Sequence, residues 1–330
     1  MAVVSTSWGG PHTFPAVHQA GVEALERFGL VVREHPGTRR SAQVLRADPR
    51  GRATDLNAAF GDPSVNAIVA SIGGDDSARI LPFLDPDLIR SNPKVFMGYS
   101  DTTTQLLFAH QLGLVTFNGP AVMAGFAQSA WFPGFDQHVR SILFEPTPTH
   151  EYRPFPHWVD SYADWNSTDD PTAVGPLQPH DGWRWLNGDG PVTGPLVGGC
   201  IEVLEFLKGS RFWPSDDWWT GRILFLETSE DRPTIEQVRY WLFNYGVQGV
   251  FDRIVGLALG RARGYTDEQK QALDETVRSV VVDEFGASHV VIATNLDFGH
   301  TDPQWILPLG VTAELDPRAQ TFRLLEPAVE

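Results

Sequence analysis

The stretch Lys94–Leu107 reads KVFMGYSDTTTQLL, and it determines the fold expected for the first half of the chain. A short apolar run ends at Tyr99, Ser100 follows, and a helical pattern begins at Thr102. A strand that leads directly into a helix is typical of a parallel sheet covered by helices on both faces. Such a turn would present the Ser100 hydroxyl at the carboxyl edge of the sheet, beside the unpaired N–H groups that begin the helix.

The residues around this stretch repeat the alternation of strand and helix. Strands are predicted at Ala2–Ser5, Val31–Glu34, Ala67–Ile72 and Val95–Tyr99, and helices at Ala16–Phe28, Ala53–Phe60, Asp76–Leu84 and Thr102–Gln111. We therefore predict an α/β fold in which residues 1–145 form a mostly parallel, flavodoxin- or Rossmann-like sheet with helices on both faces. No G-x-G-x-x-G motif follows the first strand, so a dinucleotide site is not expected.

A proline-rich stretch separates this block from a second one. Residues 144–156 read FEPTPTHEYRPFP, and we assign residues 146–190 to a linker and a Trp-rich substrate loop. Residues 191–330 are predicted to form a smaller C-terminal α/β domain. Its expected strands are Arg222–Leu226, Ile254–Leu259, Val290–Ala293 and Val311–Leu315, and its expected helices are Ile201–Leu207, Thr234–Phe243 and Asp267–Phe285.

Composition excludes several classes of function. The net charge is −16, and an acidic surface repels phosphate backbones, so nucleic acid is not an expected partner. No run approaches the roughly 18 apolar residues of a membrane span. The N-terminus lacks the features of a signal peptide, and the single cysteine, Cys200, fits a reducing compartment, so we expect a cytoplasmic protein. No Cys/His cluster has metal-ligand spacing, and neither a metal nor a cofactor is expected.

Two interpretations of Ser100 compete. Its hydroxyl could act as a nucleophile, with the N–H groups of the following helix stabilising a developing oxyanion. The G-x-S-x-G elbow of hydrolases works in this way, but the fifth position here is Thr102. Alternatively, Ser100 or Asp101 only caps the helix. Spacing alone favours the cap.

One glycine turn and two single residues are further candidates for chemistry. Gly73 and Gly74 follow a buried strand and are expected at the same sheet edge as Ser100, where glycine lets backbone approach a ligand closely. A tight turn is the alternative explanation. Glu227 ends the apolar strand ILFLE and could orient a histidine, or it could be one more solvated acid. His300 lies in a loop between glycine and threonine, but nine other histidines compete with it.

Six segments, taken together, resemble the LD-carboxypeptidase family. They are GGDDSARILPFLD (73–85), NPKVFMGYSDTTTQLLFA (92–109), TFNGPAVM (116–123), VTGPLVGG (192–199), ILFLET (223–228) and FGHTDPQWILPLG (298–310). They span nearly the whole chain in the family's order. The resemblance implies a serine hydrolase with a Ser–Glu–His triad, carried here by Ser100, Glu227 and His300, and it also implies a homodimer.

The resemblance assigns a role to each of these residues. His300 would take the proton of Ser100 and later protonate the leaving amine, while Glu227 would contact the other ring nitrogen and stabilise the imidazolium. The oxyanion hole implied by the family uses backbone N–H groups, which here belong to Gly73 or Gly74 and to Asp101.

Two positions depart from the family pattern. Cys200 follows Gly198-Gly199 where many relatives have asparagine, and Asn118 stands where relatives often have histidine or tyrosine. Both are expected to border the substrate, so substrate details do not carry over at these positions.

The family has two branches that differ in substrate. One removes the terminal D-alanine of peptidoglycan tetrapeptides, and the other, the microcin C immunity proteins, cleaves the amide between an aminoacyl or peptidyl group and a nucleotide mimic. Seven of eleven tryptophans lie between Trp158 and Trp219, and GWRWLNGDGPVTG (182–194) resembles the immunity branch.

The Trp-rich loop is expected over or beside the site. Trp183 and Trp185 are predicted to stack on a flat ring of the substrate, although these tryptophans could instead pack a domain or dimer interface. A small peptide or aminoacyl-nucleotide is therefore the expected ligand. A protein that binds such ligands without turnover is the alternative from another class.

Overall fold

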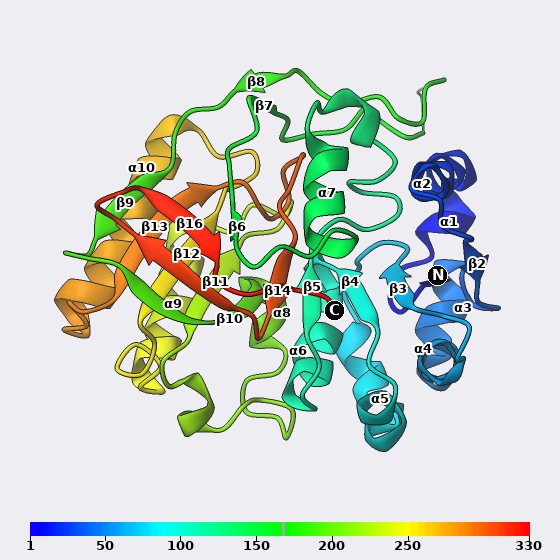
Figure 1. Cartoon of the computed structure of the whole chain (residues 1–330), viewed down its shortest axis with the longest axis horizontal. Helices are drawn as coiled ribbons and strands as arrows, with labels where there is room; N and C mark the ends of the chain where they lie inside the picture. The colour runs from blue at the N-terminus through cyan, green and yellow to red at the C-terminus, as the bar shows by residue number, and fades with distance from the viewer. Residues whose placement is uncertain (167–168) are drawn as a thin grey trace.

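The computed structural model describes residues 1–166 and 169–330, and its first sheet is built on parallel strands (Figure 1). These strands are β1 (Ala2–Val4), β2 (Arg33–Glu34), β3 (Ala67–Ala70), β4 (Val95–Gly98) and β5 (Thr116–Asn118). Their order, β5-β4-β3-β1-β2, places β4 beside β3 and β5. Strand β4 is therefore an internal strand of the sheet, and Ser100 follows its carboxyl end.

Helices cover this sheet, and several begin where proline or a capping side chain allows. They are α1 (Gly10–Thr13), α2 (Pro15–Arg27), α3 (Ala42–Ala47), α4 (Pro49–Gly61), α5 (Pro86–Ser91), α6 (Thr103–Gln111) and α7 (Phe135–Leu143), with 3-10 turns η1 (Ser77–Phe83), η2 (Ser100–Thr102) and η3 (Ser129–Trp131). The side chain of Asp85 accepts hydrogen bonds from the first turn of α5, which has Pro86 at its first position. The helix expected over Asp76–Leu84 is a 3-10 turn, and it contains Pro82, which cannot donate a backbone hydrogen bond.

The second sheet has a parallel centre and antiparallel margins. Its central strands are β10 (Val192–Cys200), β11 (Ile223–Glu227), β12 (Gly256–Gly260) and β13 (Val291–Leu296). At its margins lie β15 (Thr312–Asp316), β16 (Thr321–Leu324), β6 (His150–Glu151) and β9 (Arg184–Asn187), and a separate pair joins β7 (His157–Trp158) to β8 (Gln178–Pro179). The remaining helices are α8 (Ile201–Glu205), η4 (Asp216–Trp219), α9 (Ile235–Val247), α10 (Asp267–Arg278) and its π-helical continuation η5 (Ser279–Glu284).

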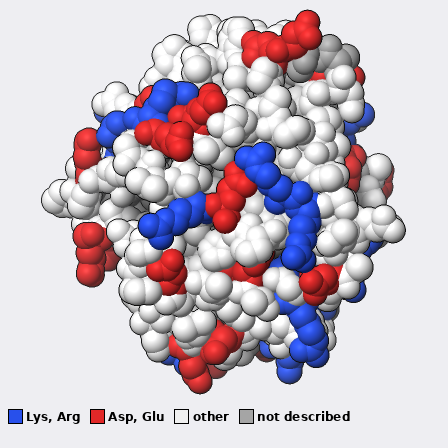
Figure 2. All heavy atoms as spheres, turned by 90° about the vertical axis from the view of Figure 1, so that its right-hand side faces the viewer, with Lys and Arg blue, Asp and Glu red and all other residues white. Residues whose placement is uncertain are grey.

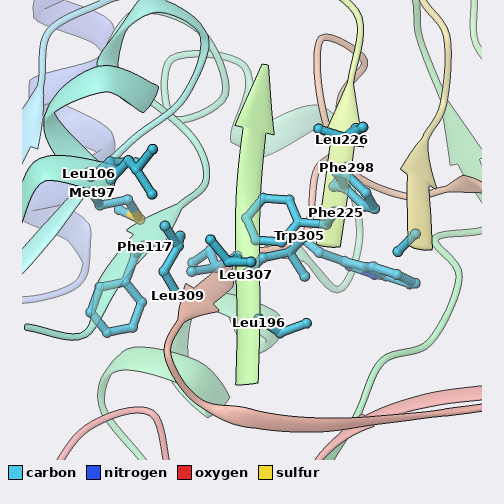
Figure 3. Packing of buried hydrophobic residues seen from close by; sticks show 14 of the residues in the cluster. Met97, Leu106, Phe117, Leu196, Phe225, Leu226, Phe298, Trp305, Leu307 and Leu309 are labelled. Carbon is cyan, nitrogen blue, oxygen red and sulfur yellow. The ribbon is translucent and has the colours of Figure 1, made fainter. Parts of the chain in front are cut away.

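One strand from the C-terminal part of the chain joins the first sheet. Strand β14 (Leu307–Leu309) pairs antiparallel with β5, and it lies between the two sheets in Figure 1. Figure 3 shows Leu307 and Leu309 between Phe117 of the first sheet and Leu196 of the second. A single apolar cluster consequently runs through both sheets. The α/β class predicted from the sequence is confirmed, and β14 links the two halves.

The distribution of surface charge and the character of the helices are relevant to binding of nucleic acids and membranes. Figure 2 shows basic and acidic side chains interspersed on the face to which α1–α4 contribute, so that face is not uniformly acidic. Within residues 1–166 and 169–330, no helix combines the length and apolar character needed to cross a bilayer.

Candidate active site

Ser100 lies at a sharp turn between β4 and α6. Its φ angle is +56°, a left-handed conformation that is uncommon for a residue other than glycine. Strained backbone of this kind is concentrated at functional sites, where the surrounding structure maintains it. The geometry is that of a strand–turn–helix elbow, although the G-x-S-x-G pattern is absent.

Asp101 maintains this turn from inside the protein. Its buried Oδ2 accepts hydrogen bonds from the Ser7 hydroxyl at 2.5 Å, the Asp76 N–H at 3.0 Å and the Ser77 N–H at 2.8 Å. The Ser77 hydroxyl also donates to the Asp101 carbonyl oxygen. Neither η2 nor α6 has a side-chain cap, so Asp101 does not cap the helix that follows it. Instead it ties the start of η1 to the elbow.

The glycine turn after β3 closely approaches Ser100. A Cβ atom added at Gly73 would lie 2.9 Å from Ser100 Oγ and 3.4 Å from the Asp101 nitrogen. Only glycine fits at such separations without displacement of its neighbours. The backbone of Gly73 and the N–H of Asp101 are thus close to one another beside the Ser100 hydroxyl, as two oxyanion donors would need to be.

His300 and Glu227 meet although 73 positions separate them in the chain. Glu227 is the last residue of β11, and His300 lies in the loop after β13. Nδ1 of His300 is 2.5 Å from Glu227 Oε2, and both side chains are almost completely buried. Gly299 makes the approach possible, because its φ is +100° and an added Cβ would lie 2.8 Å from Glu227 Cβ.

A second carboxylate lies at the other ring nitrogen. Glu230 Oε2 is 3.0 Å from His300 Nε2, but it lies off the direction of the ring N–H, so the contact is an ion pair rather than an aligned hydrogen bond. No aligned bond from Nε2 to Ser100 is formed in the described part of the chain either. Burial by itself lowers the pKa of His300, but Glu227 and Glu230 together raise it to about 10. Burial also raises the pKa of Glu227 above its ordinary value.

Ser100 and His300 open into one cavity of about 760 Å³. Gly73 and Gly74 line it as well. The other lining residues are Trp8, Phe14, Ala42, Arg46, Ile72, Asp75, Tyr99, Ala124, Tyr162, Ala163, Asp164, Trp165, Asn166, Glu230, Asp231 and Arg263. The structure thus brings the predicted nucleophile, histidine and glycine turn to one site, with Glu227 directly behind the histidine.

Trp183 and Trp185 do not line this cavity. The indole N–H of Trp183 donates to Asp297 at 2.7 Å, and its ring packs edge-on against Trp305. Trp185 lies in β9 opposite Ala293 of β13 and packs against the apolar core. The structure therefore directs both rings into protein packing and away from this cavity. For Trp185 the cause is the pairing of β9 with β13, and for Trp183, which precedes β9, it is the contacts with Asp297 and Trp305.

Asn118 and Cys200 are not among the cavity-lining residues either. Both are buried at the ends of strands, Asn118 in β5 and Cys200 in β10. The thiol of Cys200 donates to Glu202, and its N–H donates to Thr103. Both side chains are fully buried, and neither faces the cavity, so the expectation that they contact substrate stays a prediction.

The aromatic side chains that do line the cavity were not selected from the sequence. Tyr162 and Trp165 lie in the expected substrate loop and stack with ring centroids 5.7 Å apart. Phe14 packs edge-on against Trp165, and Trp8 packs against Phe14. Trp165 was one of the seven tryptophans noted in the sequence, but no local pattern distinguished it from the others.

Cys200, Glu227 and His300 could also be considered as metal ligands, because one ligand atom from each lies within 4.8 Å of the others. Burial raises the pKa of the Cys200 thiol well above its ordinary value, and a protonated thiol is a poor ligand. Glu227 already occupies Nδ1 of His300. These three side chains therefore fit a hydrogen-bonded His300–Glu227 pair beside a neutral Cys200 thiol better than a metal site.

We expect hydrolytic activity to survive chelation for this reason. Incubation with excess EDTA should leave kcat/KM unchanged within error, and added zinc should not increase it. The measurement is turnover before and after dialysis against chelator, with metal content determined by mass spectrometry. Activity lost on chelation and restored by zinc would show that the cluster binds a catalytic metal.

Known proteins resemble the chain over nearly its full length. A family model described as the LD-carboxypeptidase N-terminal domain matches residues 1–119, and one described as the C-terminal domain matches residues 193–315. A Vibrio cholerae protein named a putative carboxypeptidase is 32% identical over 304 residues, which cover 91% of this chain and 87% of that protein.

Immunity proteins are also similar in sequence and in structure. The microcin C7 self-immunity protein MccF of Escherichia coli is 28% identical, with 90% of this chain and 84% of that protein covered. The solved structure of MccF in complex with aspartyl sulfamoyl adenosine has a TM-score of 0.84 and 27% identity, and it covers 100% of this chain and 96% of that one. The chain therefore belongs to the LD-carboxypeptidase family and is a hydrolase of the serine peptidase type.

Proposed function

We propose that this enzyme cleaves the amide-type bond between an aminoacyl or peptidyl group and a nucleotide-like group. The observation that carries the proposal is a single cavity containing Ser100, His300 and an aromatic wall. The similarity to MccF, solved with aspartyl sulfamoyl adenosine, supports the same ligand class.

The chemistry follows from the positions of the side chains. The Ser100 hydroxyl attacks the acyl carbonyl while Nε2 of His300 takes its proton, and Glu227 stabilises the imidazolium through Nδ1. The N–H groups of Gly73 and Asp101 stabilise the oxyanion. His300 then protonates the leaving nitrogen, and water hydrolyses the acyl-enzyme with His300 as base.

The cavity offers features for the nucleotide-like group. Tyr162 and Trp165 present aromatic surface on which a base can stack, and the indole N–H of Trp165 is buried without a hydrogen-bond partner in residues 1–166 and 169–330. Arg263 also lines the cavity, where its positive charge suits a phosphate or sulfamate.

Such an activity inactivates an aminoacyl-nucleotide antibiotic, so we propose self-immunity or detoxification in the cytoplasm as its role. The single cysteine supports this compartment. We further propose a homodimer. Exposed apolar side chains on one helix, Tyr240, Phe243 and Val247 of α9, supply a surface suited to self-association.

A second candidate function is release of terminal D-alanine from peptidoglycan tetrapeptides. The Vibrio cholerae relative named a putative carboxypeptidase favours it, and Arg263 could pair with the carboxylate of such a peptide. A mass-spectrometric assay with a muropeptide and an aminoacyl sulfamoyl adenylate side by side separates the two functions. Binding of either ligand without turnover would instead indicate the non-catalytic alternative.

Replacing Trp165 by alanine tests the nucleotide site. We expect kcat/KM for the aminoacyl adenylate analogue to fall by about 5- to 150-fold, equivalent to losing one base stack of about 1–3 kcal/mol. The muropeptide has no such ring, so its kcat/KM should change little. The comparison variant is Trp185→Ala, whose ring lies outside the cavity and should not discriminate between substrates. Equal losses on both substrates in Trp165→Ala would make the ring structural and favour the carboxypeptidase function.

A further inference from the structure

The imidazole of His300 is held between two carboxylates. Glu227 contacts Nδ1 at 2.5 Å from the buried side, and Glu230 lies 3.0 Å from Nε2 on the cavity side. The two acids differ in exposure, since the Glu227 side chain is 0% exposed and that of Glu230 is 54% exposed. Glu227 orients the ring and stabilises its cation from the buried side, whereas Glu230 contacts the very atom that must accept the proton of Ser100.

This arrangement opposes catalysis in the empty site. Two negative charges favour the imidazolium form of His300, which cannot act as a base. The pKa of His300 is about 10, and the contact with His300 holds the pKa of Glu230 down at about 2. Near neutral pH, the histidine of the unliganded enzyme is therefore protonated and paired with Glu230.

The other charged or titratable groups near His300 and Glu230 include one cation, Arg263. The Tyr99 ring packs edge-on against His300, with its pKa raised far above the physiological range by burial, and Cys200 is a neutral thiol behind Glu227. Asp302 lies close enough to interact with His300, and Arg263 close enough to interact with Glu230. Among the described ion pairs, however, Glu230 is joined only to His300.

A cation in the cavity would compete for Glu230. Glu230, Ser100 and His300 all line the same space. In an aminoacyl substrate, the α-ammonium group is two bonds from the carbonyl carbon that Ser100 attacks. When that carbon is placed at Ser100 Oγ, the ammonium is therefore brought into the neighbourhood of Nε2, where the exposed Glu230 carboxylate is available.

We propose that Glu230 is a positioning residue, which an α-ammonium group on the acyl side of the substrate draws away from His300 so that the base is freed. This inference rests on the proposed function, and it names the substrate class more closely. Preferred substrates carry a free amine next to the scissile carbonyl. A longer peptide, in which that nitrogen is part of a peptide bond, cannot displace Glu230 in this way.

The protons balance in this sequence. Glu230 leaves Nε2 to pair with the ammonium, and the imidazolium then releases its Nε2 proton to water in the cavity. Neutral His300 accepts the proton of Ser100 as Oγ bonds to the carbonyl carbon. His300 passes this proton to the leaving nitrogen as the C–N bond breaks. Water then attacks the acyl-enzyme while His300 accepts its proton, and that proton returns to Ser100 Oγ as the acid is released. When the acyl product departs, Nε2 takes up a proton from solvent and Glu230 returns to it.

The test compares two substrates that differ only in this charge. Alanyl sulfamoyl adenosine carries the α-ammonium group, and its desamino analogue, propionyl sulfamoyl adenosine, has the same carbon skeleton without it. At pH 7 the wild-type enzyme should cleave the alanyl compound at least about tenfold faster in kcat/KM, because one unit in the pKa of the base changes its neutral fraction tenfold.

The variant Glu230→Gln keeps the side-chain shape and removes the charge. Loss of the negative charge lowers the pKa of His300. The acid limb of the pH profile of kcat/KM for the propionyl compound should therefore shift to lower pH by about one to three units. At pH 7 this variant should cleave the propionyl compound about 10- to 1,000-fold faster than wild type, and its preference for the alanyl compound should be lost. Glu236→Gln, the same change at an exposed position outside the cavity, is the matched control.

A covalent probe separates failure of this inference from failure of the proposed function. Labelling of wild type by a fluorophosphonate, absent in Ser100→Ala, reports the nucleophile without requiring a substrate amine. If Ser100 is labelled but both substrates react equally and Glu230→Gln leaves the pH profile unmoved, the role of Glu230 is wrong while the hydrolase mechanism stands. If Ser100 is never labelled at any pH, the proposed function itself fails.

Discussion

Ser100→Ala and His300→Ala are each expected to lower kcat by roughly 10⁴–10⁶. In the proposed mechanism, Ser100 supplies the atom that forms the acyl-enzyme, and a serine hydroxyl is a weak nucleophile until a base removes its proton. Because the two residues act as one unit, the double variant should be only slightly slower than either single variant. Residual activity would come from substrate binding and the oxyanion donors.

The measurement is single-turnover cleavage of an aminoacyl sulfamoyl adenylate followed by mass spectrometry. Circular dichroism and thermal unfolding should show that both variants remain folded. His289→Ala is the control for histidine replacement, since His289 is exposed and does not line the cavity. Near-full activity in Ser100→Ala would show that another residue is the nucleophile.

Glu227→Ala is expected to lower kcat by about 10⁴, somewhat less than loss of Ser100 or His300. The alanine variant removes both the acceptor that orients Nδ1 of His300 and the charge that stabilises its cation. Since the carboxylate is completely buried, water cannot easily replace it. Loss of the negative charge also lowers the pKa of His300, so stabilisation of the imidazolium in the transition state is weakened.

The isosteric variant Glu227→Gln separates orientation from charge. Glu227 Oε1 makes no hydrogen bond with the described residues, so an amide can turn its oxygen toward Nδ1 without disrupting another contact. We expect Glu227→Gln to retain more activity than Glu227→Ala, with both variants measured across a range of pH. Equal losses in the two variants would assign the whole effect to charge, and wild-type rates in both would exclude Glu227 from the mechanism.

Much of the fold could be predicted because local sequence patterns indicate where strands and helices form. Strands β3, β4 and β11 are continuous apolar runs, and their buried positions require this composition. The strands that were not predicted include the longest, β10, whose glycines and proline are not typical of a strand. Others are very short. Strand β14 has three residues, and only its pairing with β5 makes it a strand.

Part of the candidate site could likewise be predicted from the sequence, and part only became visible in the structure. The strand-to-helix pattern around Ser100 placed the hydroxyl at a sheet edge, while its left-handed φ became visible only in the structure. Family resemblance selected Glu227 and His300, but Glu230 was passed over. The two acids are three positions apart in sequence, and only the folded loop directs them to opposite nitrogens of one ring.

The sequence by itself determined the alternation of strands and helices, the turn that carries Ser100 and the family to which the chain belongs. These depend on neighbouring residues, whose periodicity and order are visible without coordinates. The tertiary structure alone decided which aromatic rings face the cavity. Trp185 is directed into protein packing because β9 pairs with β13, and Trp183 because its indole N–H donates to Asp297. Trp165 reaches the cavity because its loop packs against Phe14. Contacts between such distant segments depend on the packing of the whole chain, which no local pattern records.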